Sequence, residues 1–160
     1  MKTNNKMPKL NPYLIGLIIL SFAVGILVYD HLPEKIPIHW NLEGEVDAYG
    51  NKFFGIFSLP FLTLAVYLLM IVLPRIDPKS ESYAQFTGVY NVFTTLLVLF
   101  LLSLYGLVLL AAFGYQINAG LVVRLGLGIL FIVLGTQLPK IKHNYFFGIK
   151  TPWTLASEDV

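Results

Sequence analysis

Residues 89–113 read VYNVFTTLLVLFLLSLYGLVLLAAF and contain no charged side chain. A helix that spans a membrane needs about 20 consecutive apolar residues, because each residue advances it by about 1.5 Å across a hydrocarbon layer of about 30 Å. The run is too long for a strand of a membrane barrel, and it shows no alternation of apolar and polar residues. We therefore predict that it forms a transmembrane helix.

Three further apolar runs have a comparable length. They lie at 12–29, 53–73 and 121–137. The whole chain of 160 residues is 56% hydrophobic and 12% charged, whereas soluble domains are about 45–50% apolar and about 25% charged. The mean hydropathy of +0.71 agrees with this excess of apolar residues. The sequence therefore predicts an all-α integral membrane protein with four transmembrane helices, and it argues against a soluble enzyme or a disordered tail.

The charge and the cysteine content exclude two kinds of chemistry. The net charge is +2, and the basic residues are scattered, unlike the clustered basic residues of a nucleic-acid-binding surface. The chain has no cysteine, which excludes disulfides and thiolate ligation of a metal. We expect the lipid bilayer as a partner, no direct contact with nucleic acid, and no cofactor.

Lysine and arginine are distributed unequally among the segments that flank the four runs. The N-terminal segment, the second loop and the C-terminal tail hold Lys2, Lys6, Lys9, Arg75, Lys79, Lys140, Lys142 and Lys150. The first loop, 30–52, holds Lys35 and Lys52, and the third loop, 114–120, holds neither lysine nor arginine. Because basic loops stay on the cytoplasmic side, we predict a multi-pass membrane protein with both termini cytoplasmic.

The extracellular loop 30–52 has the composition of a compact, structured segment. Residues 36–40 read IPIHW, in which large apolar residues alternate with proline and histidine, as in a short strand or an extended segment on the membrane surface. Gly44 and residues 49–51, Tyr-Gly-Asn, are typical of turns. We expect this loop to hold one shape.

Two interpretations remain for the ionisable residues of this loop. His31, His39 and Asp47 are potential zinc ligands, and three ligands with a water molecule would make a metal-dependent membrane hydrolase. Their spacing matches no standard zinc site. We therefore favour a hydrogen bond between His39 and Asp47, and we expect neither a metal nor an enzyme. A small transporter is a further possibility, against which we count the absence of Asp and Glu from the four runs.

The C-terminal segment 138–160 combines basic, aromatic and capping residues. Gly148 predicts a turn, and Thr151 followed by Pro152 is typical of a helix N-cap with proline at the first helical position. The aromatic residues at 145–147 and Trp153 would lie among the lipid headgroups, and the lysines would meet anionic lipid. The residues leave open whether the segment anchors itself to the membrane surface or docks a partner.

Motifs in these two segments resemble the SdpI family of bacterial membrane immunity proteins. LPEKIPIHWN at 32–41, GEVD at 44–47 and YGNK at 49–52 look like the family's N-terminal domain of unknown function. NYFFGIKTPWTL at 144–155 looks like its C-terminal signature. The resemblance implies that the protein binds or neutralises a secreted sporulation-delaying peptide toxin outside the cell. It also implies that a cytoplasmic repressor protein is recruited to the membrane in signal transduction.

The resemblance further implies candidate residues and a division of the chain. The extracellular candidates are His39, Trp40, Asn41, Gly44 and Asp47. The candidates of the cytoplasmic motif are Asn144, Gly148, Lys150, Thr151, Pro152, Trp153 and Thr154. We divide the chain into an N-terminal helical hairpin, 1–75, and a C-terminal region, 76–160. The family signature continues into two more helices, so we expect this chain to be a short or truncated form of a six-helix protein.

Overall fold

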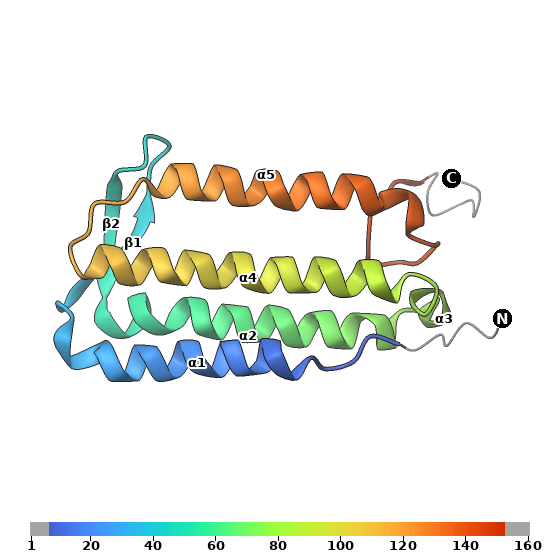
Figure 1. The fold of residues 1–160 in the computed structure, drawn as a ribbon, viewed down its shortest axis with the longest axis horizontal. Coiled ribbons are helices and arrows are strands. Elements are labelled where there is room, and N and C mark those ends of the chain that lie inside the picture. The colour runs from blue at the N-terminus through green and yellow to red at the C-terminus, as the bar shows by residue number, and fades with distance from the viewer. Residues whose placement is uncertain (1–6, 153–160) are drawn as a thin grey trace.

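The computed structural model describes residues 7–152, and four long helices dominate it (Figure 1). They are α1 (Pro12–Val28), α2 (Lys52–Ile76), α4 (Thr87–Ala112) and α5 (Ala119–Gln137). Each is long and apolar enough to cross a membrane, and single 3-10 turns, η1 (Tyr29–His31) and η2 (Leu138–Lys140), follow α1 and α5. The four predicted spans are thus confirmed to within a few residues at each end.

A small antiparallel hairpin lies between α1 and α2. Strand β1 (Lys35–Trp40) pairs with β2 (Val46–Asn51), which confirms the extended segment predicted at 36–40. The all-α class is therefore corrected to a mostly helical fold with one two-stranded sheet. A short helix that we did not predict, α3 (Ser80–Tyr83), lies between α2 and α4. The division of the chain at residue 75 stays a prediction.

Asparagine is the N-cap residue of three of the four long helices. In each case the side-chain oxygen accepts a hydrogen bond from a backbone N–H of the first turn: Asn11 from Tyr13, Asn51 from Phe54 and Asn118 from Leu121. These caps supply partners for N–H groups that have none within the first turn of a helix. The starts of these helices are therefore specified locally.

At Pro74 of α2, a side chain of α4 supplies a hydrogen bond that the helix itself cannot make. The second apolar run was predicted to end at residue 73, directly before Pro74, but α2 continues through Pro74 to Ile76. Proline has no N–H, so the carbonyl of Met70, four residues earlier, loses its donor within the helix. The hydroxyl of Tyr90 on α4 donates to that carbonyl at 2.7 Å. Because another helix supplies the missing donor, α2 tolerates proline at this position.

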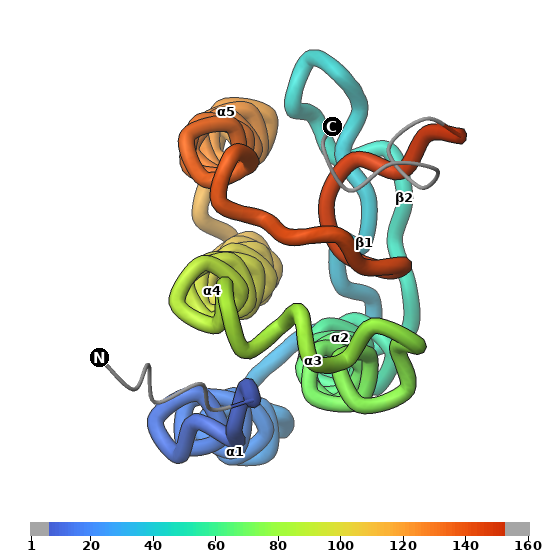
Figure 2. The backbone as a smooth tube through the Cα atoms, turned by 90° about the vertical axis from the view of Figure 1, so that its right-hand side faces the viewer, coloured from blue at the N-terminus to red at the C-terminus, as the bar shows by residue number. Residues whose placement is uncertain are grey.

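Helix α4 lies at the centre of the bundle, with α1 and α2 on one side and α5 on the other (Figure 2). The small residues Ser21 and Gly25 of α1 lie at its contact with α2 and α4. The Tyr105 hydroxyl donates to the Ser21 carbonyl at 2.9 Å, and a Cβ added at Gly25 would lie 2.8 Å from Cγ2 of Ile56. Helix α5 is the least covered by protein: 11% of its most apolar 18-residue stretch is buried, compared with 22–28% for the other three long helices.

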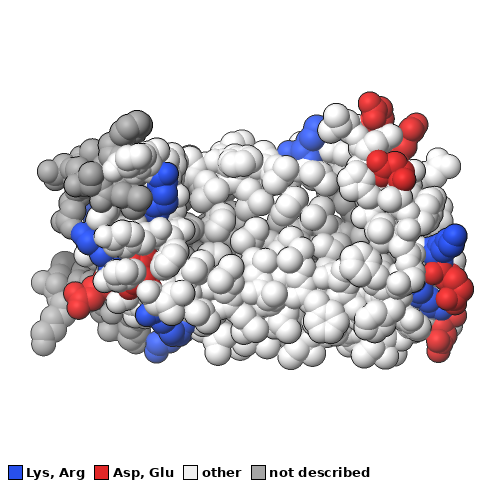
Figure 3. Space-filling view, turned by 180° about the vertical axis from the view of Figure 1, so that it is seen from behind, with Lys and Arg blue, Asp and Glu red and all other residues white. Residues whose placement is uncertain are grey.

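Charged side chains gather at the two ends of the molecule and leave a long middle zone almost free of them (Figure 3). We refer to the end that carries β1 and β2 as the hairpin end. The opposite end, where residues 138–152 fold back, is the motif end. A zone of this kind between two charged ends is typical of a protein that spans a bilayer, and it places the two polar segments on opposite sides of the membrane.

Candidate functional site

The hairpin packs on the bundle through β1, whose Ile36 and Pro37 are both buried. Ile36 of β1 is fully buried, and it packs so closely on α2 that a Cβ added at Gly55 would lie 2.9 Å from its Cβ. Residues 49–51, which we predicted as a turn, belong to β2; that prediction was wrong because they pair with 35–37 of β1. Gly50 instead makes room for Ile38, whose Cγ2 would lie 3.0 Å from an added Cβ.

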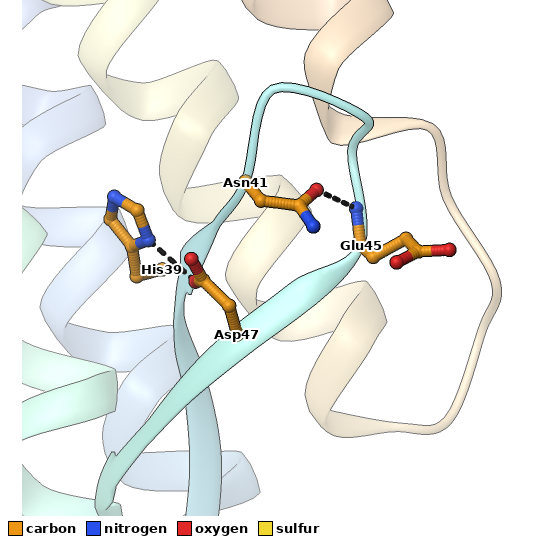
Figure 4. A network of polar contacts seen from close by, with 4 residues as sticks. All are labelled: His39, Asn41, Glu45 and Asp47. Carbon is orange, nitrogen blue, oxygen red and sulfur yellow. Dashed lines mark hydrogen bonds and ion pairs between the residues drawn. The ribbon is translucent and has the colours of Figure 1, made fainter.

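The turn of the hairpin lies at residues 41–45, where polar groups hold it in one conformation (Figure 4). The side-chain oxygen of Asn41 accepts a hydrogen bond from the Glu45 N–H at 2.8 Å. The backbone N–H of Asn41 donates to the Glu45 carbonyl at 2.9 Å. Gly44 has a φ of +89°, a conformation that favours glycine, which confirms the turn predicted there. His39 Nδ1 lies 2.5 Å from Asp47 Oδ1, which confirms the predicted hydrogen bond.

The three residues of the metal hypothesis do not come together. Within residues 7–152 no three side chains of the His, Cys, Asp and Glu types lie close enough to one another to hold a metal ion. Asp47 binds His39, while His31 belongs to the 3-10 turn that follows α1. The metal-dependent hydrolase therefore lacks its proposed ligand set in the part of the chain that the structure describes.

An apolar groove of about 610 Å³, which the sequence did not reveal, lies beneath the hairpin. Three of the extracellular candidates, His39, Trp40 and Asn41, line its upper part, and side chains of α2, α4 and α5 line the rest. Arg124 of α5 also lines the groove and donates to the Leu42 carbonyl at 3.5 Å. The sequence could not predict the groove, because its walls come from four elements far apart in the chain.

At the motif end, Asn144 is the centre of a buried hydrogen-bond network. Its side chain is fully buried, and its Nδ2 donates to the carbonyls of Lys142 at 2.8 Å and Phe147 at 2.9 Å. Its Oδ1 accepts from the Phe147 N–H at 2.6 Å, the Phe146 N–H at 3.1 Å and the Tyr83 hydroxyl at 3.3 Å. Asn144 thus closes the turn that ends at Gly148, whose φ of +98° confirms the predicted turn.

A buried carboxylate, Asp77, ties this turn to the end of α2. Its Oδ2 accepts from the Tyr83 hydroxyl at 3.0 Å and the Tyr145 N–H at 2.9 Å, and its Oδ1 accepts from the Lys79 N–H at 2.8 Å. Sequence reasoning missed Asp77, although aspartate followed by proline, as at Asp77-Pro78, is a turn signal. Its burial depends on Tyr145, which lies 68 residues further along the chain.

The pKa values of two ionisable side chains near Asp77 are shifted. Burial raises the pKa of Tyr83, and the hydrogen bond to Asp77 raises it further. Burial lowers the pKa of Lys150, and the charge of Asp77 partly opposes that change. The Lys150 ammonium donates to the Asn144 carbonyl at 2.8 Å, so it holds the motif together.

The aromatic residues of the motif separate into two groups. Phe147 is buried, and its ring centroid lies 4.9 Å from that of Tyr90 and 5.2 Å from that of Phe93 on α4. The prediction that it lies among lipid headgroups was wrong, because the turn at Asn144 directs it into the bundle. Tyr145 and Phe146 are 44% and 47% exposed.

The remaining motif candidates lie at the end of the described chain. Thr151 is half-buried and Pro152 is exposed. Trp153, Thr154 and the rest of the helix predicted to begin at Pro152 lie outside the described residues.

Comparisons with known proteins match both ends of the molecule. Residues 16–64 match a family described as a domain of unknown function, DUF1648. The immunity protein SdpI of Bacillus subtilis (strain 168) is 34% identical over 152 residues, which cover 95% of this chain and 70% of SdpI. The uncharacterized membrane protein YbgB of the same strain is 31% identical over 70 residues, covering 35% of this chain and 77% of YbgB. No solved structure matches the chain.

Proposed function

Because this chain belongs to the family of the immunity protein SdpI, we propose that it protects a bacterial cell against a secreted peptide toxin. The hairpin end faces the outside and binds or neutralises the toxin, and the motif end faces the cytoplasm and docks a repressor protein. The observation that carries the proposal is 34% identity along 95% of the chain to a protein named for immunity. The mechanism is binding and not catalysis.

The distribution of charge supports this orientation. The hairpin and the segment before it carry Glu34, Glu43, Glu45 and Asp47. The motif end carries lysines and Arg75 in the last turn of α2, and basic residues favour the cytoplasmic side.

The orientation has a direct test, since the chain has no native cysteine. Tyr49 is 60% exposed on β2, so a Tyr49→Cys variant should react with a membrane-impermeant maleimide on intact cells. A Lys142→Cys variant should react only after the cells are permeabilised. The reverse pattern of labelling would refute the orientation.

The hairpin supports the proposal because its polar groups are held in place before any partner arrives. The turn is closed by Asn41, and His39 and Asp47 hold each other on the exposed face. A preorganised surface loses little conformational entropy on binding. Its acidic side chains would speed the approach of a positively charged peptide.

At the motif end, the candidates that shape the turn and the exposed side chains next to them have different roles in this proposal. Asn144 and Gly148 shape the turn, so they act on a partner only through the shape that they maintain. Tyr145, Phe146 and Ile149 expose apolar surface in the segment between Lys142 and Lys150, which suits a repressor whose docking face is both apolar and acidic.

A survival assay tests the proposed function. The chain is expressed in sensitive cells that have no immunity protein of their own. These cells are then exposed to the sporulation-delaying peptide. We expect increased survival, reduced by Asp47→Ala and unaffected by Glu81→Ala, which removes an exposed acid near the motif end. If the unmodified chain, present in the membrane at normal levels, gives no protection, the proposal is wrong.

A further inference from the structure

The groove beneath the hairpin has a shape that is set by three helices. Helix α4 lies between α2 and α5 (Figure 2), so Leu107 and Val108 of α4 form the floor between the two outer walls. The hairpin covers one end. Phe54 and Leu62 on the α2 wall are 54% and 48% exposed, so the groove is open along one side.

The depth of the groove corresponds to one leaflet of a bilayer. On α2 the lining reaches from the hairpin to Leu62, ten residues after the helix begins at Lys52. At about 1.5 Å per residue this is about 15 Å, half of the roughly 30 Å hydrocarbon thickness. The groove therefore extends from the membrane surface at the hairpin end to about the middle of the membrane.

Arg124 places a single positive charge near the upper end of this groove. It lies five residues into α5, about 7.5 Å from the helix start. Within residues 7–152 Arg124 forms no ion pair, and the side chains that line the groove include no acid. A cation in a membrane span is costly without a counter-charge. The guanidinium fits a phosphate because it can donate two parallel hydrogen bonds.

We infer that the groove binds an anionic phospholipid of the leaflet at the hairpin end, with its phosphate on Arg124 and one acyl chain along α2, α4 and α5. A peptide is less suited to the deep part, because its backbone N–H and C=O groups need polar partners. Below the hairpin, the described lining offers only Ser58 and Arg124 as polar side chains. An acyl chain needs no such partners. This inference does not depend on the proposed immunity function.

Trp40 lines the groove and provides a fluorescent reporter for this lipid. The chain has two tryptophans, so the full chain with Trp153→Phe leaves Trp40 as the only one. This variant is reconstituted in phosphatidylcholine bilayers. One series contains increasing fractions of phosphatidylglycerol brominated on one acyl chain, and a second series contains phosphatidylcholine brominated in the same way. We expect brominated phosphatidylglycerol to quench Trp40 at a mole fraction about tenfold lower than brominated phosphatidylcholine needs, because hydrogen bonds to charged groups are stronger than those between neutral groups.

Three variants decide between a specific site and general membrane contact. Arg124→Gln should abolish the preference for phosphatidylglycerol, and Arg124→Lys should keep part of it, because it keeps the charge without the bidentate geometry. Arg75→Gln, which removes the arginine at the other end of the bundle, should leave the preference unchanged. Val123→Phe, which narrows the groove, should weaken quenching by both lipids.

Specific results would overturn the inference. Equal quenching by the two lipids in the Trp153→Phe chain would show that no anionic site exists. Equal losses in Arg124→Gln and Arg75→Gln would show a general charge effect. No quenching by either lipid would show that protein, such as a second copy of the chain, fills the groove.

Discussion

Replacement of Asn144 by alanine should release the C-terminal motif from the bundle. The substitution removes two donated and three accepted hydrogen bonds. The N–H and carbonyl of Phe147 are buried and would be left without their partner, whereas the half-exposed groups of Lys142 and Phe146 can turn to water. Each unsatisfied buried group costs about 1–3 kcal/mol, so we expect a loss of about 4 kcal/mol in the free energy of unfolding.

The loss should be measured by denaturant titration in mixed micelles, with trypsin cleavage after Lys142 and Lys150 as a local readout. Asn91→Ala, which truncates an exposed asparagine on α4, should change the free energy of unfolding by less than about 0.5 kcal/mol. Tyr83→Phe removes one hydroxyl of the same network and should cost about 1–2 kcal/mol. If Asn144→Ala is as stable as Asn91→Ala and resists trypsin equally, the reasoning about this network is wrong.

Two further predictions concern the contacts between helices. Tyr90→Phe leaves the Met70 carbonyl without a donor, so it should lower the free energy of unfolding by about 1–3 kcal/mol, measured in the same titration. Gly25→Ala places a Cβ 2.8 Å from Ile56, and such overpacking should cost about 1–3 kcal/mol in thermal unfolding. Gly128→Ala, whose Cβ would meet no described atom within 4 Å, is the control; equal melting of the two glycine variants would contradict this packing argument.

Sequence patterns predicted the spans, the strand β1 and two turns because each depends on neighbouring residues. A long apolar run forms a helix in lipid wherever its backbone bonds are made within the segment. The turns at Gly44 and Gly148 follow from glycine's freedom at positive φ. The errors at Pro74 and at residues 49–51 share one cause. In both places a partner distant in the chain completes the hydrogen bonds that the local sequence lacks.

The candidate residues were predicted less completely than the fold. His39, Trp40 and Asn41 do lie together at one groove, but Arg124, which shares it, comes from a helix more than 80 residues away. Asp77 was missed for the same reason, since its burial depends on Tyr145, 68 residues further along the chain. Asn144 was identified from the motif, yet only its full burial shows that it supports the turn from within.

The scarcity of charge and its distribution determined by themselves that this chain spans a membrane four times, because the cost of placing polar groups in hydrocarbon depends on composition and run length alone. The tertiary structure decided how the two polar segments are built. Tyr90 completes α2, Asp77 holds the motif, and the hairpin with three helices encloses the groove at Arg124. Such features require groups distant in the chain to meet at hydrogen-bonding or packing distance, and only the packed helices bring them there.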